Sequence, residues 1–484
     1  MKMRNLKLGF ASLAAVAVLA ACSPATALTG ASGETATHST ATGDGGSSEA
    51  LTALLAANQK SHYSQDDSGY DESSVVDITL NGSSATASGD GVTVDGSTVT
   101  ITSAGTYRLT GSLAGQVIVN ADSQDVKLIL NGVELTNPSG SPMVVTAADE
   151  VTLILADGTE NTVSDASTYA DASGEAPSSA IDSASDLSIA GNGSLSVTGN
   201  NNDAINSADG LVIAGGDVTV KAVDDGIRGK DYVIVSGGTV DVEATGDGIK
   251  SDNETDADRG YVLIENGTVN ITAGDDGVKG FNDVAISGGS VTVSGSLEAI
   301  EAQTLVISGG ETRLTSSDDG INISGDNPQG FTITGGTVRI ESEGDGLDSN
   351  ASGTISGGSV VILGPTMGGN GSVDVQSGLT VTGGERWAIG ASGMAESPAE
   401  GSTQAFVFAN LNGGSTGEVS IADSSGNVIA TQSSSKQYSS VLYSGPSISA
   451  ESSYEILLGG KSAGTVPANQ YATGTNQQND RPGR

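Results

Sequence analysis

The chain has few of the residues on which common catalytic and metal sites depend. Its 484 residues include one cysteine and two histidines, which are Cys22, His38 and His62. One cysteine cannot form a disulfide framework, and a histidine zinc site, a Cys-His pair and a Ser-His-Asp triad are excluded within residues 71–390, the repeat-bearing part of the chain. Hydrophobic residues make up 36% of the chain and aromatic residues 3%, which argues against a wide globular core.

Basic residues and prolines are scarce as well. The 19 lysines and arginines stand against 58 acidic residues, so the formal net charge is −39. A field of this sign repels nucleic acid and anionic lipid, and it favours cations, or ligands bridged by cations, as partners. The alternative is that the acidity only keeps an exported protein soluble. Ten prolines beside 70 glycines indicate many repeated tight turns rather than a random linker.

The N-terminus indicates export. Three basic residues precede the apolar stretch Gly9–Ala20, which is too short to span a bilayer as a mature helix. The sequence Leu19-Ala20-Ala21-Cys22 is typical of a bacterial lipobox, and Cys22 is the sole thiol. We therefore predict a lipoprotein signal peptide over residues 1–21, lipidation of Cys22, and a location at the cell envelope or surface. An unmodified leftover cysteine is the alternative.

Composition divides the rest of the chain into four parts. Residues 22–70 are rich in Ala, Ser, Thr, Gly and Asp without an apolar period, and are predicted to be a flexible tether. Residues 71–390 carry alternating strands, of which those before Ser164 are predicted to be less regular opening turns. Residues 391–471 are predicted to form a small β cap, and residues 472–484 a disordered tail.

A glycine-led pattern recurs through the middle of the chain with a spacing near 22 residues. The successive intervals are 23, 22, 29, 22, 21, 26 and 22, so insertions enlarge two turns without breaking the period. The leading glycines are Gly193, Gly216, Gly238, Gly267, Gly289, Gly310, Gly336 and Gly358. Such a repeat predicts a stacked solenoid whose insertions are surface loops.

β-Branched residues alternate on both sides of the acidic turn in each repeat. Val218 and Val220 follow one leading glycine, Val240 and Val242 follow the next, and Val235 lies three residues before that second glycine. Period-2 columns of this kind bury one face of each strand, and equivalent residues stack from turn to turn. The sequence therefore predicts an all-β parallel β-helix with a narrow aliphatic core.

An acidic residue follows six of the eight leading glycines by nine positions. This ladder consists of Asp225, Asp247, Asp276, Glu298, Asp319 and Asp345, with Asp203 fitting if its turn has one extra residue. Three turns double the acid with Asp224, Asp275 and Asp318. Asp-Gly turn chemistry alone explains one aspartate per turn, but it does not explain the doubled acids.

Stacked turns place ladder carboxylates about 4.8 Å apart, where each pair repels by roughly 3 to 4 kcal/mol at the dielectric of a protein surface. Hard carboxylate oxygens, with turn carbonyls, suit calcium better than zinc. We therefore predict Ca²⁺ along this edge, joined by acids of the insertion after Asp247. The predicted ligands are Asp224, Asp225, Asp247, Asp252, Asp275, Asp276, Asp318, Asp319 and Asp345, with the strongest clustering at Asp225, Asp247 and Asp276.

Three basic residues lie three positions beyond the ladder on consecutive turns: Arg228, Lys250 and Lys279. They would either relieve the ladder's charge through ion pairs or bind the carboxylates of an acidic polysaccharide. Two catalytic mechanisms remain compatible with the composition, namely glycoside hydrolysis by paired carboxylates and proton abstraction from a uronic acid by Arg or Lys. Trp387, the single tryptophan, is predicted to plug the end of the solenoid rather than to stack on a sugar.

The chain resembles the bacterial surface carbohydrate-binding-domain family of parallel β-helices from about Val75 to Gly460. The motifs that carry the resemblance are Asp224-Asp225-Gly226-Ile227, Gly246-Asp247-Gly248-Ile249-Lys250-Ser251-Asp252, Asp275-Asp276-Gly277-Val278-Lys279-Gly280, Ala104-Gly105-Thr106-Tyr107-Arg108-Leu109-Thr110-Gly111 and Val126-Lys127-Leu128-Ile129-Leu130-Asn131-Gly132-Val133. The resemblance implies a right-handed, pectate-lyase-like β-helix with bound calcium that binds cellulose-like or pectin-like polysaccharide. The chain departs from the pattern at Leu297-Glu298-Ala299 and Met367-Gly368-Gly369, which puts calcium binding there in doubt.

Three functions are therefore open. The first is a non-catalytic, calcium-dependent polysaccharide-binding protein, monomeric and attached to the membrane only by its lipid. The second is a polyuronate lyase with Arg228, Lys250 or Lys279 as base. The third is an adhesin or envelope scaffold whose calcium is purely structural.

Overall fold

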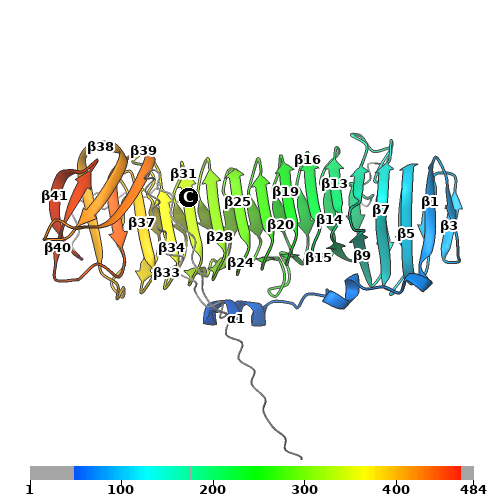
Figure 1. Ribbon diagram of the computed structural model, residues 1–484, viewed down its shortest axis with the longest axis horizontal. Helices are drawn as coiled ribbons and strands as arrows, with labels where there is room; N and C mark the ends of the chain where they lie inside the picture. The colour runs from blue at the N-terminus through cyan, green and yellow to red at the C-terminus, as the bar shows by residue number, and fades with distance from the viewer. Residues whose placement is uncertain (1–47, 172, 174–175, 470–484) are drawn as a thin grey trace, which may run out of the picture. The chain divides into compact units, whose positions relative to one another are not determined.

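The computed structural model describes residues 48–171, 173 and 176–469, all within one compact unit, Gly43–Arg484. The predicted signal peptide, Cys22 and the tail from residue 472 lie outside the described residues. About 12 turns stack along one axis, with 53% strand and 4% helix (Figure 1). The prediction of an all-β solenoid is confirmed.

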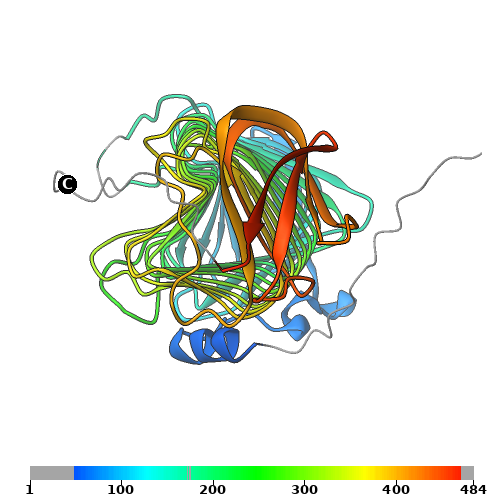
Figure 2. The ribbon, with the colours of Figure 1, turned by 90° about the vertical axis from the view of Figure 1, so that its left-hand side faces the viewer.

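Each regular turn has three strands rather than the two that alternation suggested. A strand of about six residues ends at the acidic corner, a strand of three residues follows, and a strand of about four residues ends at the glycine corner. Viewed along the stack, equivalent strands of successive turns lie over one another (Figure 2). The three rows are named here row 1, row 2 and row 3 in that order.

Strands of each row pair in parallel with the strand one turn away. Row 1 consists of β10 (Glu160–Ser164), β13 (Ser194–Gly199), β16 (Asp217–Ala222), β19 (Thr239–Ala244), β22 (Thr268–Thr272), β25 (Ser290–Gly295), β28 (Glu311–Ser316), β31 (Thr337–Ser342) and β34 (Ser359–Leu363). Row 2 consists of β4 (Thr98–Ile101), β6 (Gln116–Asn120), β8 (Met143–Ala147), β11 (Ile181–Ser183), β14 (Ile205–Ser207), β17 (Ile227–Gly229), β20 (Ile249–Ser251), β23 (Val278–Gly280), β26 (Ile300–Ala302), β29 (Ile321–Ile323), β32 (Leu347–Ser349) and β35 (Val373–Val375). Row 3 consists of β9 (Glu150–Leu155), β12 (Asp186–Gly191), β15 (Gly210–Ile213), β18 (Tyr232–Val235), β21 (Tyr261–Ile264), β24 (Asp283–Ile286), β27 (Thr304–Ile307), β30 (Gly330–Ile333), β33 (Gly353–Ile355) and β36 (Leu379–Val381).

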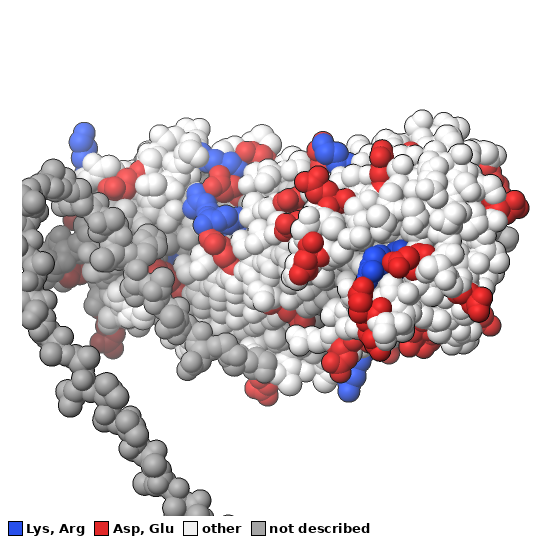
Figure 3. Space-filling model, turned by 45° about the vertical axis from the view of Figure 1, so that its right-hand side comes forward, with Lys and Arg blue, Asp and Glu red and all other residues white. Residues whose placement is uncertain are grey.

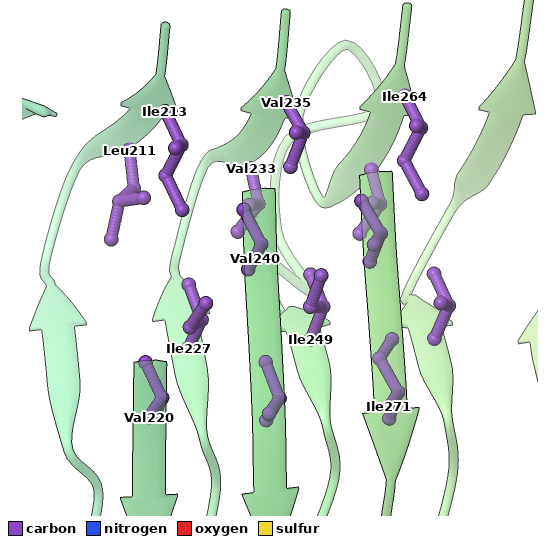
Figure 4. Close-up of a cluster of buried hydrophobic side chains, with 14 of the residues drawn as sticks. Leu211, Ile213, Val220, Ile227, Val233, Val235, Val240, Ile249, Ile264 and Ile271 are labelled. Carbon is purple, nitrogen blue, oxygen red and sulfur yellow. The ribbon is translucent and has the colours of Figure 1, made fainter. Parts of the chain in front are cut away.

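Aliphatic side chains from all three rows meet inside the turns (Figure 4). Val220 of row 1, Ile227 of row 2, and Val233 and Val235 of row 3 are all at most 1% exposed. Their partners one turn on are again aliphatic, as in the pairing of Ile227 with Ile249. Each such side chain contributes roughly 1.5–3 kcal/mol by burial, so the repeated columns are the main source of the fold's stability.

The glycine corner needs glycine for two reasons. The second glycine of each corner has a positive φ, for example 87° at Gly216 and 81° at Gly238. A Cβ on Gly238 would lie 2.5 Å from the carbonyl oxygen of Gly216 in the turn before. The period of the repeat is thus set where backbones of successive turns approach most closely.

The opening turns are less regular, as predicted. Antiparallel hairpins begin the stack, and two longer strands run without a break through the place of the later glycine corner. These elements are β1 (Val76–Gly82), β2 (Ala85–Ala87), β3 (Val92–Asp95), β5 (Gly105–Ala114) and β7 (Val126–Thr136).

An antiparallel β cap closes the C-terminal end, as predicted. Its strands are β37 (Glu385–Gly390), β38 (Phe406–Ala422), β39 (Val428–Ser444), β40 (Ser453–Leu458) and β41 (Lys461–Pro467). β37 joins the two parts, since it pairs in parallel with β34 and antiparallel with β39. Trp387 is 3% exposed, and its ring centroid lies 4.6 Å from that of Tyr443. This is the predicted role of a plug.

The tether prediction is wrong for residues 48–70. These residues belong to a strap, residues 48–74, which contains α1 (Glu49–Ala57), η1 (Gln65–Ser68) and η2 (Glu72–Ser74). Leu51 and Leu54 pack on the outer surface of row 3 in one cluster with Val212 and Ile234. From β15 to β27 the outer face of row 3 is apolar as well, and the strap lies along the outside of this row (Figure 1). No helix in the described ranges is long and apolar enough to cross a membrane.

Candidate cation site and carbohydrate-binding region

The acidic ladder forms the corner between row 1 and row 2, and in five turns one oxygen of the ladder aspartate accepts an amide hydrogen of the next turn. The Asp225 Oδ1 accepts a hydrogen bond from the Asp247 amide at 2.8 Å, and the Asp247 Oδ1 accepts from the Asp276 amide at 2.9 Å. The Asp319 Oδ1 accepts likewise from the Asp345 amide at 2.6 Å. The turn chemistry considered from the sequence therefore acts between turns, not within each Asp-Gly pair.

The second oxygen of Asp225, Asp247 and Asp276 faces the column that holds the basic residues. The Lys250 Nζ lies 3.0 Å from the Asp225 Oδ2 and 2.8 Å from the Asp247 Oδ2. The Lys279 Nζ lies 2.6 Å from the Asp276 Oδ2 and also pairs with Glu301. The predicted strongest calcium cluster thus has a lysine counter-charge, which favours the charge-relief interpretation of the basic column. Hydrogen bonds to carboxylates raise the pKa of both lysines against the opposing effect of burial.

The other predicted ligands divide into two kinds. The doubled acids Asp224, Asp275 and Asp318 are exposed at the rim of the ladder. Asp252 is instead the partner of Arg228, whose Nη2 and Nε lie 2.7 and 2.9 Å from the Asp252 Oδ2. The remainder of that insertion leaves the ladder, because the Asp258 carbonyl accepts a hydrogen bond from the strap at Gln59. The expectation that the whole acidic insertion lies beside the ladder is wrong.

The C-terminal part of the ladder has a different character. Carboxylate oxygens of Asp319, Asp345 and Asp348 lie within 4.8 Å of one another. In the part of the chain that the structure describes, no lysine or arginine forms an ion pair with them. Burial first, and then neighbouring carboxylates, raise the pKa of each of the three to about 7.

Asp348 was not among the predicted ligands. It occupies the place that Lys250 and Lys279 hold in earlier turns. The sequence feature that could have identified it is the change from basic to acidic residues along that column. Between them lie Glu301 and Asn322, in register with Asp348. The buried Asn322 Oδ1 has no hydrogen-bond partner among the described residues, so it offers a neutral oxygen on the residue in register with Asp348.

The expectation that the solenoid has no histidine beside it is wrong, because the strap places His62 against row 3. The strap brings its Nε2 to 2.8 Å from the Ser188 Oγ and its Nδ1 to 3.1 Å from Asp186 and 2.7 Å from the Tyr232 hydroxyl. The Ser188 Oγ also bonds to Glu150 at 2.9 Å. Ser188 is 0% exposed, so this serine cannot meet a substrate. The constellation holds the strap in place; sequence spacing gave no sign of it, because 126 residues separate His62 from Ser188.

On the face drawn in Figure 3, several acidic side chains lie next to basic ones. Residues 95–327 match the family model "Carbohydrate-binding domain-containing protein". The repeat region resembles a carbohydrate-binding domain. This confirms the resemblance to a carbohydrate-binding family that the motifs indicated.

Two further likenesses each cover part of the chain. A carbohydrate-binding domain-containing protein of Acetivibrio thermocellus is 37% identical over 137 residues, which is 28% of this chain and 48% of the relative. The chain therefore matches about half the length of that relative. A solved structure, described as a gadolinium derivative of the polysaccharide lyase-like protein from C. thermocellum, is 36% identical and covers 45% of this chain and 90% of its own, with a TM-score of 0.44.

Proposed function

We propose that this protein binds polysaccharide without cleaving it, and that a calcium ion held by Asp319, Asp345 and Asp348 takes part. The observation that carries the calcium proposal is the set of three partly buried carboxylates without a basic partner in the described ranges. The match of residues 95–327 to carbohydrate-binding domains supports the polysaccharide as ligand.

The residues fit calcium in number and kind. Three carboxylates and the unpartnered Asn322 oxygen are hard oxygen ligands from two successive turns, and calcium accepts such irregular sets more readily than magnesium does. Because their pKa values are about 7, these carboxyl groups are partly protonated at neutral pH unless a bound cation displaces the protons. A bound divalent cation would offset the repulsion among the three carboxylates. It would also leave outer coordination positions for sugar hydroxyl or carboxylate oxygens.

Lyase activity has less support from the geometry. A base must be unprotonated near neutral pH, whereas Lys250 and Lys279 lie in ion pairs that raise their pKa. Arg228 is engaged by Asp252 in the same way. These three residues thus serve first as internal counter-charges. Contact of any of them with a glycan carboxylate remains a prediction.

The location at the cell surface rests on the N-terminal sequence alone. Lipidation of Cys22 would attach the protein to a membrane, with residues 23–47 between the lipid and the strap. Cys22→Ser should then release the protein from the membrane fraction, and unchanged membrane association would contradict the anchor.

One experiment separates the candidate functions. The purified protein is incubated with a polysaccharide panel, in calcium or in chelator, while pull-down and ultraviolet absorbance are recorded together. Calcium-dependent binding without new unsaturated product supports the proposal. Growth of absorbance would instead identify a lyase, and the absence of both signals would favour a scaffold.

A further inference from the structure

An open groove of about 480 Å³ lies between the strap and the glycine corner of successive turns. The strap contributes Tyr63, Gln65 and Ser68 as one wall. The floor is formed by the corner itself, including Gly215 and Gly216. The groove lies at the glycine corner, between row 3 and row 1, whereas the ladder lies at the corner between row 1 and row 2. It is therefore separate from the candidate cation site.

The floor has unused hydrogen-bond donors. Gly215 and Gly216 are partly exposed, and neither donates its amide hydrogen to another described residue. Thr239, one turn on, instead donates its own amide to the Gly216 carbonyl. Backbone amides need a partner, so these two bind water or the oxygen of a ligand. Because glycine is required at the corner, no side chain covers them.

The wall has a half-buried aromatic ring. Tyr63 packs on the row 3 cluster with part of its surface exposed. Its hydroxyl has a hydrogen-bonding neighbour in Ser68, and burial raises its pKa. A tyrosine fixed in this way presents a flat apolar surface at low entropic cost. Gln65 adds an exposed amide beside it.

Charge narrows the class of ligand. The groove lining has no charged side chain, and Asp66 and Asp67 flank it on the strap. In a protein of net charge −39, an anionic ligand at this place would be repelled. A neutral sugar ring, with hydroxyls at its edge and an apolar C–H face, complements amide donors and a tyrosine together.

We infer that the groove is a subsite for one neutral pyranose unit of the bound polysaccharide, with its ring face on Tyr63 and hydroxyl oxygens at the Gly215 and Gly216 amides. This inference rests on the proposed polysaccharide-binding function. It assigns the strap a second role, since the strap supplies one wall of the subsite.

The test is calorimetric titration with a neutral β-1,4-glucan oligosaccharide and, separately, with an oligogalacturonate. Tyr63→Ala should weaken binding of the neutral oligosaccharide by about tenfold, the scale of one aromatic contact, whereas Tyr63→Phe should stay within a few-fold of the parent. Tyr70→Ala is the matched control, because Tyr70 is 43% exposed on the strap and outside the groove lining.

Because Tyr63→Ala could loosen the strap, a second measurement uses the unaltered protein. The peptide containing Gly215 and Gly216 should gain protection from hydrogen exchange when the neutral oligosaccharide is added. Parent-like binding by Tyr63→Ala, no added protection, or binding of oligogalacturonate alone would each overturn the subsite while leaving polysaccharide binding intact. Failure of the parent to bind any polysaccharide would overturn both.

Discussion

At the scale of single residues, the two oxygens of a ladder aspartate have different partners. Asp247 is 2% exposed; its Oδ1 accepts the amide of the next turn, and its Oδ2 pairs with Lys250. Sequence could place this residue in the ladder, because the nine-residue offset recurs. It could not distinguish the two oxygens, because the partner of Oδ1 is an amide of the next turn and the partner of Oδ2 is a lysine of the basic column.

Replacing Asp247 should therefore separate the two functions. Asp247→Ala leaves the buried Asp276 amide without its acceptor and Lys250 with Asp225 as its remaining partner, and should lower the free energy of unfolding by about 1.5–3 kcal/mol. Asp247→Asn keeps an acceptor and should cost less. Denaturant titration measures both, with Asp224→Ala as an exposed control expected within about 0.5 kcal/mol of the parent. Equal effects of Asp247→Ala and Asp224→Ala would contradict the role given to the ladder.

The raised pKa values predict how stability depends on pH when divalent cations are removed. Asp319, Asp345 and Asp348 have pKa values of about 7 in the folded state, against about 3.9 in an unfolded chain. The folded state then holds more protons between these limits, so stability should fall as pH rises from about 4 to 7. Thermal unfolding in chelator across this range checks it. The double variant Asp345→Asn, Asp348→Asn should show a smaller loss; an unchanged loss would place the effect elsewhere.

At the scale of elements, the sequence predicted which strand faces are buried but did not predict the segment that covers row 3. Alternation in row 1, as at Val218 and Val220, predicted one buried face correctly. The run Tyr232–Val235 is apolar without alternation, and all four residues are buried. Such a run signals burial on both faces. The sequence did not show what would cover the outer face, because α1 (Glu49–Ala57) lies far away in the chain and its surroundings have the composition of a linker.

The strap should depend on its two buried leucines. Leu54→Asp puts a charge against row 3 and should release α1, so that residues 48–74 become sensitive to limited proteolysis while the circular dichroism of the solenoid stays the same. Ala53→Asp makes the same change on the exposed side of the helix and should leave the strap protected. Cleavage of the parent strap at the rate of Leu54→Asp would show that the contact is too weak to hold it.

At the scale of the whole molecule, the change of charge along one column divides the solenoid into two parts. Lys250 and Lys279 neutralise ladder acids, whereas at Asp348 the column adds a further acid. The period, the ladder and the cap followed from the sequence, since each depends on residues within one or two turns. Which carboxylates lack a counter-charge depended on how three-stranded turns stack, and the sequence placed the strongest cluster at Asp225, Asp247 and Asp276 instead.

This division predicts where calcium acts on stability. Calcium that binds only the folded state should stabilise it by about 2.7 kcal/mol at a hundredfold excess over Kd, seen as a higher melting temperature than in chelator. Magnesium should substitute poorly, since it requires a tighter octahedral shell. Asp348→Asn should abolish most of the calcium response, whereas Asp318→Asn, an equal change of charge at an exposed neighbour, should keep it. If both variants respond as the parent does, or if Asp225→Asn alone removes the response, calcium is not held by the C-terminal acids, and the lysine-paired part of the ladder becomes the place to look for it.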